Sequence, residues 1–315
     1  MTDPLPVTRA DVEAAHAAIR PLVRRTPVIA VERSVLGLGD GSPLALKLEQ
    51  LQHTGSFKAR GASWNLLSGD LPEAGVAGAS GGNHGAALAW AAARAGVPCD
   101  IFVFSHTPDA KAKRIEGYGA RVHRVSSDFD ELMAATHDHV DATGARLVHA
   151  YDQPGTLAGQ GTVALEFLAD ADVDTLLVAT GGGGLIGGMA AYAENRVKVV
   201  SVEPEACPQM HAALEAGKPV PVPSSGYARD SLGPALIGAL GFAVAQQFVD
   251  DAVLVPDDAI RGAQATLWDR LRLVVEPGGA AALAALTSGA YQPEPDERVG
   301  VLLCGANVDA VHWPD

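Results

Sequence analysis

The sequence predicts an α/β protein in which mainly parallel sheets are flanked by helices. Two observations support this fold class. Short apolar runs alternate with helical stretches along most of the chain. These runs are also nearly continuous, as expected for parallel strands that are buried on both faces. The chain has 315 residues, which is enough for two domains or one large domain.

The first half of the chain begins with a helix signal. Thr8 and Asp11 resemble an N-terminal cap, and Val12, Ala15 and Ile19 then share one helical face. Strands are expected at 44–50, 76–80, 100–104, 121–125 and 146–150. Helices are expected at 84–96, 109–119 and 128–144, and the second of these is closed by glycine.

The second half continues the same alternation. Strands are expected at 175–179, 197–202 and 298–304, and helices at about 157–169, directly after the glycines near 181, at 257–273 and at 278–289. Residues 217–235 are irregular and rich in proline, glycine and serine. We expect a long loop there, placed near a functional site.

Composition excludes several classes of function. The formal net charge is −14, which argues against binding to nucleic acid or to an anionic membrane. Cys99, Cys207 and Cys304 are too few and too irregularly spaced for a disulfide scaffold or a zinc site. Neither an apolar N-terminal stretch nor a membrane-spanning window is found. We therefore expect a cytoplasmic protein.

The strongest local signal is the stretch "TLLVATGGGGLIGGMAAYA", residues 175–193, in which four glycines join a strand to a helix. Glycine lets several backbone N–H groups approach one ligand, and the helix N-terminus adds partial positive charge. This predicts an anion cradle for a phosphate. Gly182, Gly184 and Gly187 also satisfy a dinucleotide fingerprint, with Glu203 as the ribose-binding acid. A nicotinamide-dependent oxidoreductase is therefore an alternative, although it leaves the first 150 residues unexplained.

Three further stretches contain candidate site residues. Lys58 in "GSFKARGA" lies in the first turn of an expected helix, where the helix N-terminus and burial disfavour its charge. "ASGGNHGAALA", residues 79–89, is a second glycine loop whose amides, Asn83 and His84 suit a carboxylate. Cys304 ends a strand, at the position where α/β proteins bind ligands. Taken singly, each also fits a purely structural role.

Together and in this order, the four motifs resemble the fold type II pyridoxal-phosphate enzymes, whose type is the tryptophan synthase β chain. The most similar members are the serine/threonine dehydratases and serine racemases, and the resemblance spans about residues 8–310. It implies that Lys58 binds the cofactor aldehyde as a Schiff base and then acts as base at the substrate α-carbon. It also implies a cofactor site of Phe57, Lys58, Asn83, Gly181, Gly182, Gly183, Gly184, Leu185, Glu276 and Cys304. Ser80, Gly81, Asn83 and His84 would bind the substrate carboxylate.

The chain departs from this family at three positions. Serine racemases carry a second serine where this chain has Gly81, so elimination is favoured over racemisation. Many relatives bind a divalent cation after a V-E-P sequence, with a glutamate, a backbone carbonyl and an aspartate as ligands. This chain keeps Glu203 but has Gln209 in place of the aspartate. A neutral amide is a poor ligand for a hard cation, so Glu203 is only a weak metal candidate. His84, in place of threonine, argues against β-replacement by a sulfur nucleophile.

The resemblance therefore predicts a pyridoxal 5′-phosphate-dependent ammonia-lyase that converts L-serine, L-threonine or a similar β-hydroxy amino acid to a 2-oxo acid and ammonia. Alternatives are a 3-hydroxyaspartate dehydratase, a serine racemase, a β-replacement enzyme or, outside the class, the nicotinamide enzyme. A large domain of residues 1–69 and 152–315 would bind the cofactor, and a small domain of residues 70–151 would carry the asparagine loop. A homodimer is expected.

Overall fold

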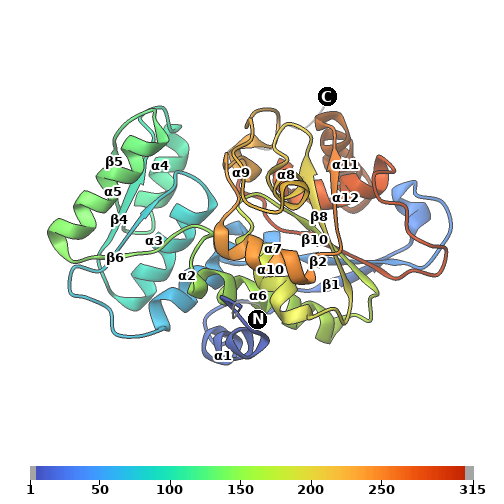
Figure 1. The fold of residues 1–315 in the computed structure, drawn as a ribbon, viewed down its shortest axis with the longest axis horizontal. Helices are drawn as coiled ribbons and strands as arrows, with labels where there is room; N and C mark the ends of the chain where they lie inside the picture. The colour runs from blue at the N-terminus through green and yellow to red at the C-terminus, as the bar shows by residue number, and fades with distance from the viewer. Residues whose placement is uncertain (1–4, 309–315) are drawn as a thin grey trace.

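Residues 5–308, which a computed structural model describes, form two β-sheets that lie side by side (Figure 1). The larger sheet has the strand order β1-β2-β10-β7-β8-β9, and the smaller has the order β5-β4-β3-β6. Neighbouring strands are parallel in both sheets except for the antiparallel pair β1 and β2. The predicted α/β class with two mainly parallel sheets is confirmed.

The strands are short, and most are buried. The larger sheet consists of β1 (Val28–Val31), β2 (Leu44–Leu48), β7 (Thr175–Ala179), β8 (Lys198–Pro204), β9 (Asp251–Val255) and β10 (Val299–Leu303). The smaller sheet consists of β3 (Val76–Ala79), β4 (Cys99–Val103), β5 (Arg121–Arg124) and β6 (Arg146–Leu147).

Helices cover both sheets and fill the space between them (Figure 1). The first six are α1 (Arg9–Ile19), α2 (Lys58–Leu67), α3 (Asn83–Ala95), α4 (Asp109–Glu116), α5 (Phe129–Thr143) and α6 (Pro154–Asp170). The next six are α7 (Gly184–Ala193), α8 (Gln209–Ala216), α9 (Arg229–Leu232), α10 (Ala239–Phe248), α11 (Asp257–Leu271) and α12 (Pro277–Thr287). Short 3₁₀ turns are η1 (Arg33–Leu36), η2 (Glu49–Leu51) and η3 (His53–Gly55).

The centre of the larger sheet is assembled from distant parts of the chain. β10 pairs with β2 on one side and with β7 on the other. Because these three strands are parallel, their carboxyl ends share one edge of the sheet, where such folds bind ligands. Glu49, Cys304 and Thr180 directly follow the three strands. The residues of the predicted site therefore begin at one edge.

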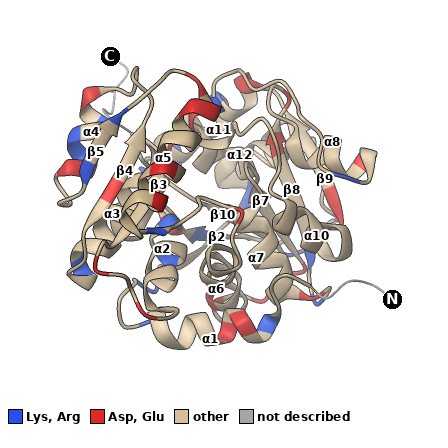
Figure 2. Ribbon diagram, turned by 60° about the vertical axis from the view of Figure 1, so that its left-hand side comes forward, with Lys and Arg blue, Asp and Glu red and all other residues tan. Residues whose placement is uncertain are grey.

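Apolar helices explain how the core of the larger sheet is closed. α7, α10 and α12 carry no charged residue, whereas charged residues gather on the outer elements (Figure 2). Nearly all of α7 and α12 is buried, as expected for helices that are apolar on every side. The smaller sheet has a separate hydrophobic cluster, centred on Val76, Leu88 and Ile101.

Several elements differ from the prediction. β6 covers only Arg146 and Leu147 instead of 146–150, because the chain turns at His149, whose Nδ1 accepts from the N–H groups of Tyr151 and Asp152. α6 begins earlier than expected, at Pro154, a residue that suits the first helical position. β1, α8, α10 and β9 were not predicted. The irregular 217–235 segment is a loop that holds the four-residue α9.

The small sheet lies within residues 76–147, inside the expected small domain, while the domain limits themselves remain a prediction. Among residues 5–308, no helix is both long and apolar enough to cross a membrane.

Candidate active site

The start of α2 is joined to the end of β10, which brings Lys58 beside Cys304. Phe57 N donates to Cys304 O at 3.2 Å, and Ser56 forms an isolated bridge with Gly305. Phe57 is the N-cap residue, and no side chain caps the first turn of α2. The position of Lys58 therefore depends on contacts made by the backbone and by other residues of the helix.

The amine of Lys58 lies where its charge is disfavoured. Burial lowers its pKa to about 8, although Cys304 and Glu276 oppose the shift. Its Nζ donates to Ala150 O at 2.5 Å and lies 5.1 Å from the centre of the Phe57 ring. At pH 7 the neutral fraction of such an amine is roughly 300-fold larger than that of an ordinary lysine. A neutral amine can act as a nucleophile or as a base.

The glycine loop between β7 and α7 has no room for side chains. A Cβ at Gly182 would lie 2.3 Å from the Tyr151 ring, and one at Gly184 would lie 2.6 Å from Tyr151 O. Gly183 has φ +85°, which other residues rarely adopt, and it is the N-cap of α7 without a side-chain cap. The loop is therefore a backbone surface at a helix N-terminus, with the properties of an anion cradle.

The loop of α9 covers the glycine loop. A Cβ at Gly181 would lie 3.0 Å from Leu232 Cα, and Gly278 N donates to Ser231 Oγ at 3.1 Å. The irregular 217–235 segment thus packs against the glycine loop and the start of α12.

The asparagine loop contacts the same region from the smaller sheet. Asn83 Nδ2 donates to Glu276 Oε1 at 2.6 Å, which joins the start of α3 to the start of α12. Burial raises the pKa of Glu276 to about 7, and the bond from Asn83 opposes this shift. Asn83 Oδ1 is buried and finds no partner among the described residues.

Ser80 and His84, two of the residues expected to bind a substrate carboxylate, make bonds within the protein. His84 Nε2 lies 2.9 Å from Val148 O, and burial, together with the Lys58 charge, lowers the His84 pKa to about 3. His84 is therefore neutral and donates from Nε2. Ser80 Oγ accepts from Gly82 N at 3.2 Å. The loop amides and the Ser80 hydroxyl proton remain the groups best suited to a carboxylate.

Cys304 is a neutral thiol at the end of β10. Its Sγ donates to Gly278 O at 3.4 Å. Burial and then Glu276 raise the pKa of this thiol well above its ordinary range. The side chain can thus accept or share a hydrogen bond, but it does not supply a formal charge.

The structure brings most of the predicted site together. Lys58, Asn83, Glu276 and Cys304 are linked by the contacts above, and Ala150 and Tyr151 connect Lys58 to the glycine loop. Glu203 lies elsewhere, because its carboxylate accepts from Met210 N (2.7 Å) and His211 N (2.8 Å) at the start of α8. A ribose would have to compete with these amides.

Gln209 occupies the position that a metal-binding aspartate would have. Its Nε2 donates to Leu232 O and Pro234 O, both at 2.7 Å. Burial raises the pKa of Glu203 to about 8. Within residues 5–308 there is no group of three or more histidine, cysteine or acidic residues placed to hold a metal ion.

Sequence reasoning missed Ala150, Tyr151 and Thr107. Ala150 and Tyr151 follow β6 closely, and Thr107 fills the space into which a Cβ at Gly81 would project, at 2.8 Å from its Cγ2. The available signal was position: residues just beyond the carboxyl ends of parallel strands gather at one edge.

Comparison with known proteins agrees with this geometry. A family model described as "Pyridoxal-phosphate dependent enzyme" matches residues 19–305. The chain is 34% identical over 313 residues to a serine racemase from Oryza sativa subsp. indica, covering 96% of this chain and 91% of that protein. It is 37% identical over 305 residues to an L-threonine ammonia-lyase from Geobacter sulfurreducens, covering 95% and 75%. The solved serine racemase of Dictyostelium discoideum superposes with a TM-score of 0.89 at 31% identity, covering 97% and 100%.

Proposed function

Because this chain belongs to the pyridoxal-phosphate-dependent enzyme family, we propose that it is an ammonia-lyase acting on L-serine, L-threonine or a similar β-hydroxy amino acid. The products would be a 2-oxo acid and ammonia. The cofactor of the family is pyridoxal 5′-phosphate. The match also agrees with the fold type II resemblance, including its two mainly parallel sheets.

The described residues fit this cofactor. The loop of Gly181–Gly184 presents backbone without side chains at a helix N-terminus, which suits a phosphate group. Lys58 supplies a buried amine of lowered pKa for the aldehyde, and Cys304 supplies a neutral thiol for the ring nitrogen. Ser56 Oγ and Asn83 Oδ1 are buried without partners among the described residues, as expected where a polar ligand completes a site.

When bound, the cofactor withdraws electrons from the substrate α-carbon. The loop from Ser80 to His84 would hold the substrate carboxylate with its amides. Lys58 Nζ would then remove the α-proton, and the β-hydroxyl would take up a proton and leave as water. Hydrolysis by a water molecule would then give the 2-oxo acid and ammonia. Because Cys304 is not an acid strong enough to keep the ring nitrogen charged, electron withdrawal would be moderate and would favour prompt loss of the β-substituent.

The observation that favours elimination over racemisation is the presence of glycine at position 81. Racemisation requires a group that delivers a proton to the face opposite Lys58, and Gly81 has no side chain. Thr107 fills the space that a side chain at position 81 would occupy. Racemisation is nevertheless the second candidate, because relatives named serine racemase match almost the whole chain.

The nicotinamide alternative lacks its key group, because the Glu203 carboxylate is engaged by α8. The predicted homodimer stays a prediction, which the molecular mass in solution would test.

The test uses the purified protein with added pyridoxal 5′-phosphate. We expect a visible absorption band, permanent attachment of the cofactor to Lys58 after borohydride treatment, and 2-oxo acid release from serine or threonine. Lys58→Ala should lower that release by about 10²–10⁴-fold or more, whereas the matched change Lys113→Ala on exposed α4 surface should not. A wild-type protein that stays colourless and unlabelled would overturn the proposal. A panel with 3-hydroxyaspartate and 3-phenylserine, analysed for chirality, would separate the alternatives.

A further inference from the structure

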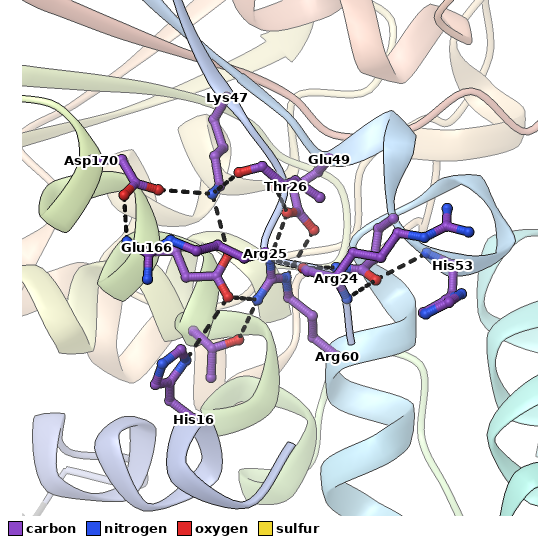
Figure 3. A network of polar contacts seen from close by, with 12 residues as sticks. His16, Arg24, Arg25, Thr26, Lys47, Glu49, His53, Arg60, Glu166 and Asp170 are labelled. Atoms are coloured by element: carbon purple, nitrogen blue, oxygen red, sulfur yellow. Dashed lines mark hydrogen bonds and ion pairs between the residues drawn. The ribbon is translucent and has the colours of Figure 1, made fainter. Parts of the chain in front are cut away.

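A buried guanidinium lies two residues beyond Lys58 in α2 (Figure 3). Arg60 is fully buried and donates to both carboxylate oxygens of Glu49, from Nε at 2.9 Å and from Nη2 at 2.7 Å. It also donates to both carboxylate oxygens of Glu166, from Nη1 at 2.9 Å and from Nη2 at 2.7 Å. A further bond from Nη1 reaches Thr162 Oγ1 at 3.2 Å. Such two-point bonds fix both the position and the plane of the guanidinium.

The charges around Arg60 are balanced. Lys47 on β2 is the second buried cation, and its Nζ donates to Thr26 O at 2.8 Å and to Glu166 Oε2 at 3.2 Å. Burial opposes the charge of Arg60, but Glu49 and Glu166 outweigh burial and raise its pKa. Two buried cations thus face two buried carboxylates, and Arg60 stays charged.

Stability alone does not account for this arrangement. Buried ion pairs often contribute no more than apolar residues of the same volume, because four charges must leave water. What distinguishes the network is the set of elements that it joins. Glu49 directly follows β2, Glu166 and Thr162 lie in α6, and Arg60 lies in the first turn of α2. The network therefore fixes the start of α2 against two other elements.

Helix geometry relates Arg60 to Lys58. At about 100° per residue, positions two apart point in nearly opposite directions. Arg60 points into the core of the larger sheet, and Lys58 points toward Ala150, which follows the last strand of the smaller sheet. A rotation of α2 by about 20° would displace a side-chain tip by about 2 Å. Displacements of that size at a reacting group cost about 10²-fold in rate.

We propose that Arg60 is the positioning residue for Lys58: its bonds to Glu49 and Glu166 set the rotation of α2 and thereby aim the Lys58 amine into the site. The inference rests on the proposed function, in which Lys58 is the reacting amine. Packing of Gly61 against α6 limits how far α2 can move sideways, with a Cβ there only 3.1 Å from Thr156 O. Rotation about the helix axis is opposed by the bonds of Arg60, together with the Phe57 N bond to Cys304 O and the bond from Asn65 Nδ2 to Thr156 Oγ1 at 2.9 Å.

The test compares two variants of the same network. Arg60→Lys keeps the charge but loses the two-point bonds, and the residue lies in α2. Lys47→Met, the control, removes the other buried cation, which lies in β2. Both variants change a fully buried cation, so both should lower the melting temperature. Three properties of each holoprotein are measured: kcat, the pH midpoint of the visible band, and the rate at which borohydride fixes the cofactor to Lys58.

We expect Arg60→Lys to lower kcat by about 10–100-fold with little change in KM, to shift the pH midpoint of the band, and to slow fixation at Lys58. Lys47→Met should keep kcat within about 3-fold of wild type and leave the visible band unchanged, because the two hydrogen bonds from Arg60 to Glu49 remain. If Arg60→Lys does not fold, Thr162→Val removes one bond to Arg60 without stranding a charge. It should move the same three quantities in the same direction, unlike the buried change Thr136→Val in α5.

Equal effects of the Arg60 and Lys47 variants on kcat and spectrum would overturn the inference and leave a purely structural network. An unchanged spectrum and kcat in Arg60→Lys would also overturn the inference. If Arg60→Lys does not fold, the same result in Thr162→Val would overturn it. The wild-type spectrum keeps the two hypotheses apart. A wild-type protein that binds no cofactor at Lys58 would refute the proposed function. If wild type is labelled at Lys58 but Arg60→Lys leaves kcat and the visible band unchanged, only the role of Arg60 is refuted.

Discussion

Lys58 illustrates how a reactive residue opposes the stability of the fold that holds it. The chain buries an amine and lowers its pKa to about 8, from the ordinary 10.5. Below pH 8 the folded protein must hold a charge that its surroundings disfavour. The unfolded chain binds this proton more tightly, so unfolding is favoured by up to about 3 kcal/mol.

Replacing Lys58 should therefore stabilise the cofactor-free protein. We expect Lys58→Met to raise the free energy of unfolding at pH 7 by up to about 3 kcal/mol, measured by urea denaturation. As pH rises from 8 to 10.5, wild type gains stability because its unfolded chain loses the extra proton, so the difference should vanish. Lys113→Met, at an exposed position, should show no such difference. A variant less stable than wild type at pH 7 would contradict this account.

Gly81 gives a second prediction at the scale of single residues. Racemisation needs a proton donor on the face opposite Lys58, but a Cβ at Gly81 would lie 2.8 Å from Thr107 Cγ2 and 3.0 Å from its Oγ1. Gly81→Ser alone should therefore fit poorly. Gly81→Ser combined with Thr107→Ala should form D-serine at least about 10-fold faster than Thr107→Ala alone. Chiral chromatography of remaining serine measures this, and no gain in D-serine would refute it.

Residues within motifs were predictable, and residues that meet them across the fold were not. Lys58, Asn83 and Cys304 stand in recognisable local patterns, and the order of those patterns along the chain is enough to assign them to one site. Tyr151 and Thr107 carry no pattern of their own. Their effects come from contacts with Gly182 and Gly81, and the spacing of residues along the chain does not encode those contacts.

At the scale of elements, α4 connects the two sheets across the site. Lys111 forms an ion pair with Asp230 of α9. One turn later, Arg114 donates to Thr54 O at 2.8 Å and forms a hydrogen bond with Asn307. Three residues apart on a helix, Lys111 and Arg114 share one face. That face of α4 joins the smaller sheet to α9 and to the segments that contain Thr54 and Asn307.

We expect Lys111→Met to weaken this closed arrangement. Because Asp230 is largely exposed, the pair contributes at most about 1 kcal/mol, which corresponds to a rise in KM of about 2–5-fold. Salt should raise the KM of wild type toward that of the variant, whose own KM should respond less. Lys113→Met on the same helix is the control. Identical salt dependence in wild type and Lys111→Met would rule out the tether.

Elements with complete local signals were predicted closely. α1 begins after the Thr8 cap, and its buried residues are Val12, Ala15 and Ile19, as the pattern indicates. β6 was predicted too long, because the bonds made by His149 end the strand. Local side-chain bonds of this kind depend on which way the ring turns, and hydrophobic periodicity does not report that.

At the scale of the molecule, the candidate site lies where the carboxyl ends of strands from both sheets come together. β2, β7 and β10 end on the side of Lys58 and the glycine loop, and β3 and β6 end at Ser80 and near Ala150. Alternation along the chain was enough to predict mainly parallel sheets, and the family resemblance divided them between two domains. It did not predict strand order, because β10 joins β2 to β7 from the far end of the sequence. No local rule specifies such a pairing.

That central place of β10 has a consequence for the growing chain on the ribosome. Synthesis delivers Lys58 before the glycine loop, and Cys304 and β10, the strand that joins β2 to β7, follow every other described strand. The smaller sheet, drawn from one contiguous stretch, can close as soon as it emerges. The larger sheet cannot be completed until β10 is made, because β2 and β7 each have an unpaired edge until then. Chains stalled before β10 should therefore protect the smaller sheet from protease but not the complete larger sheet.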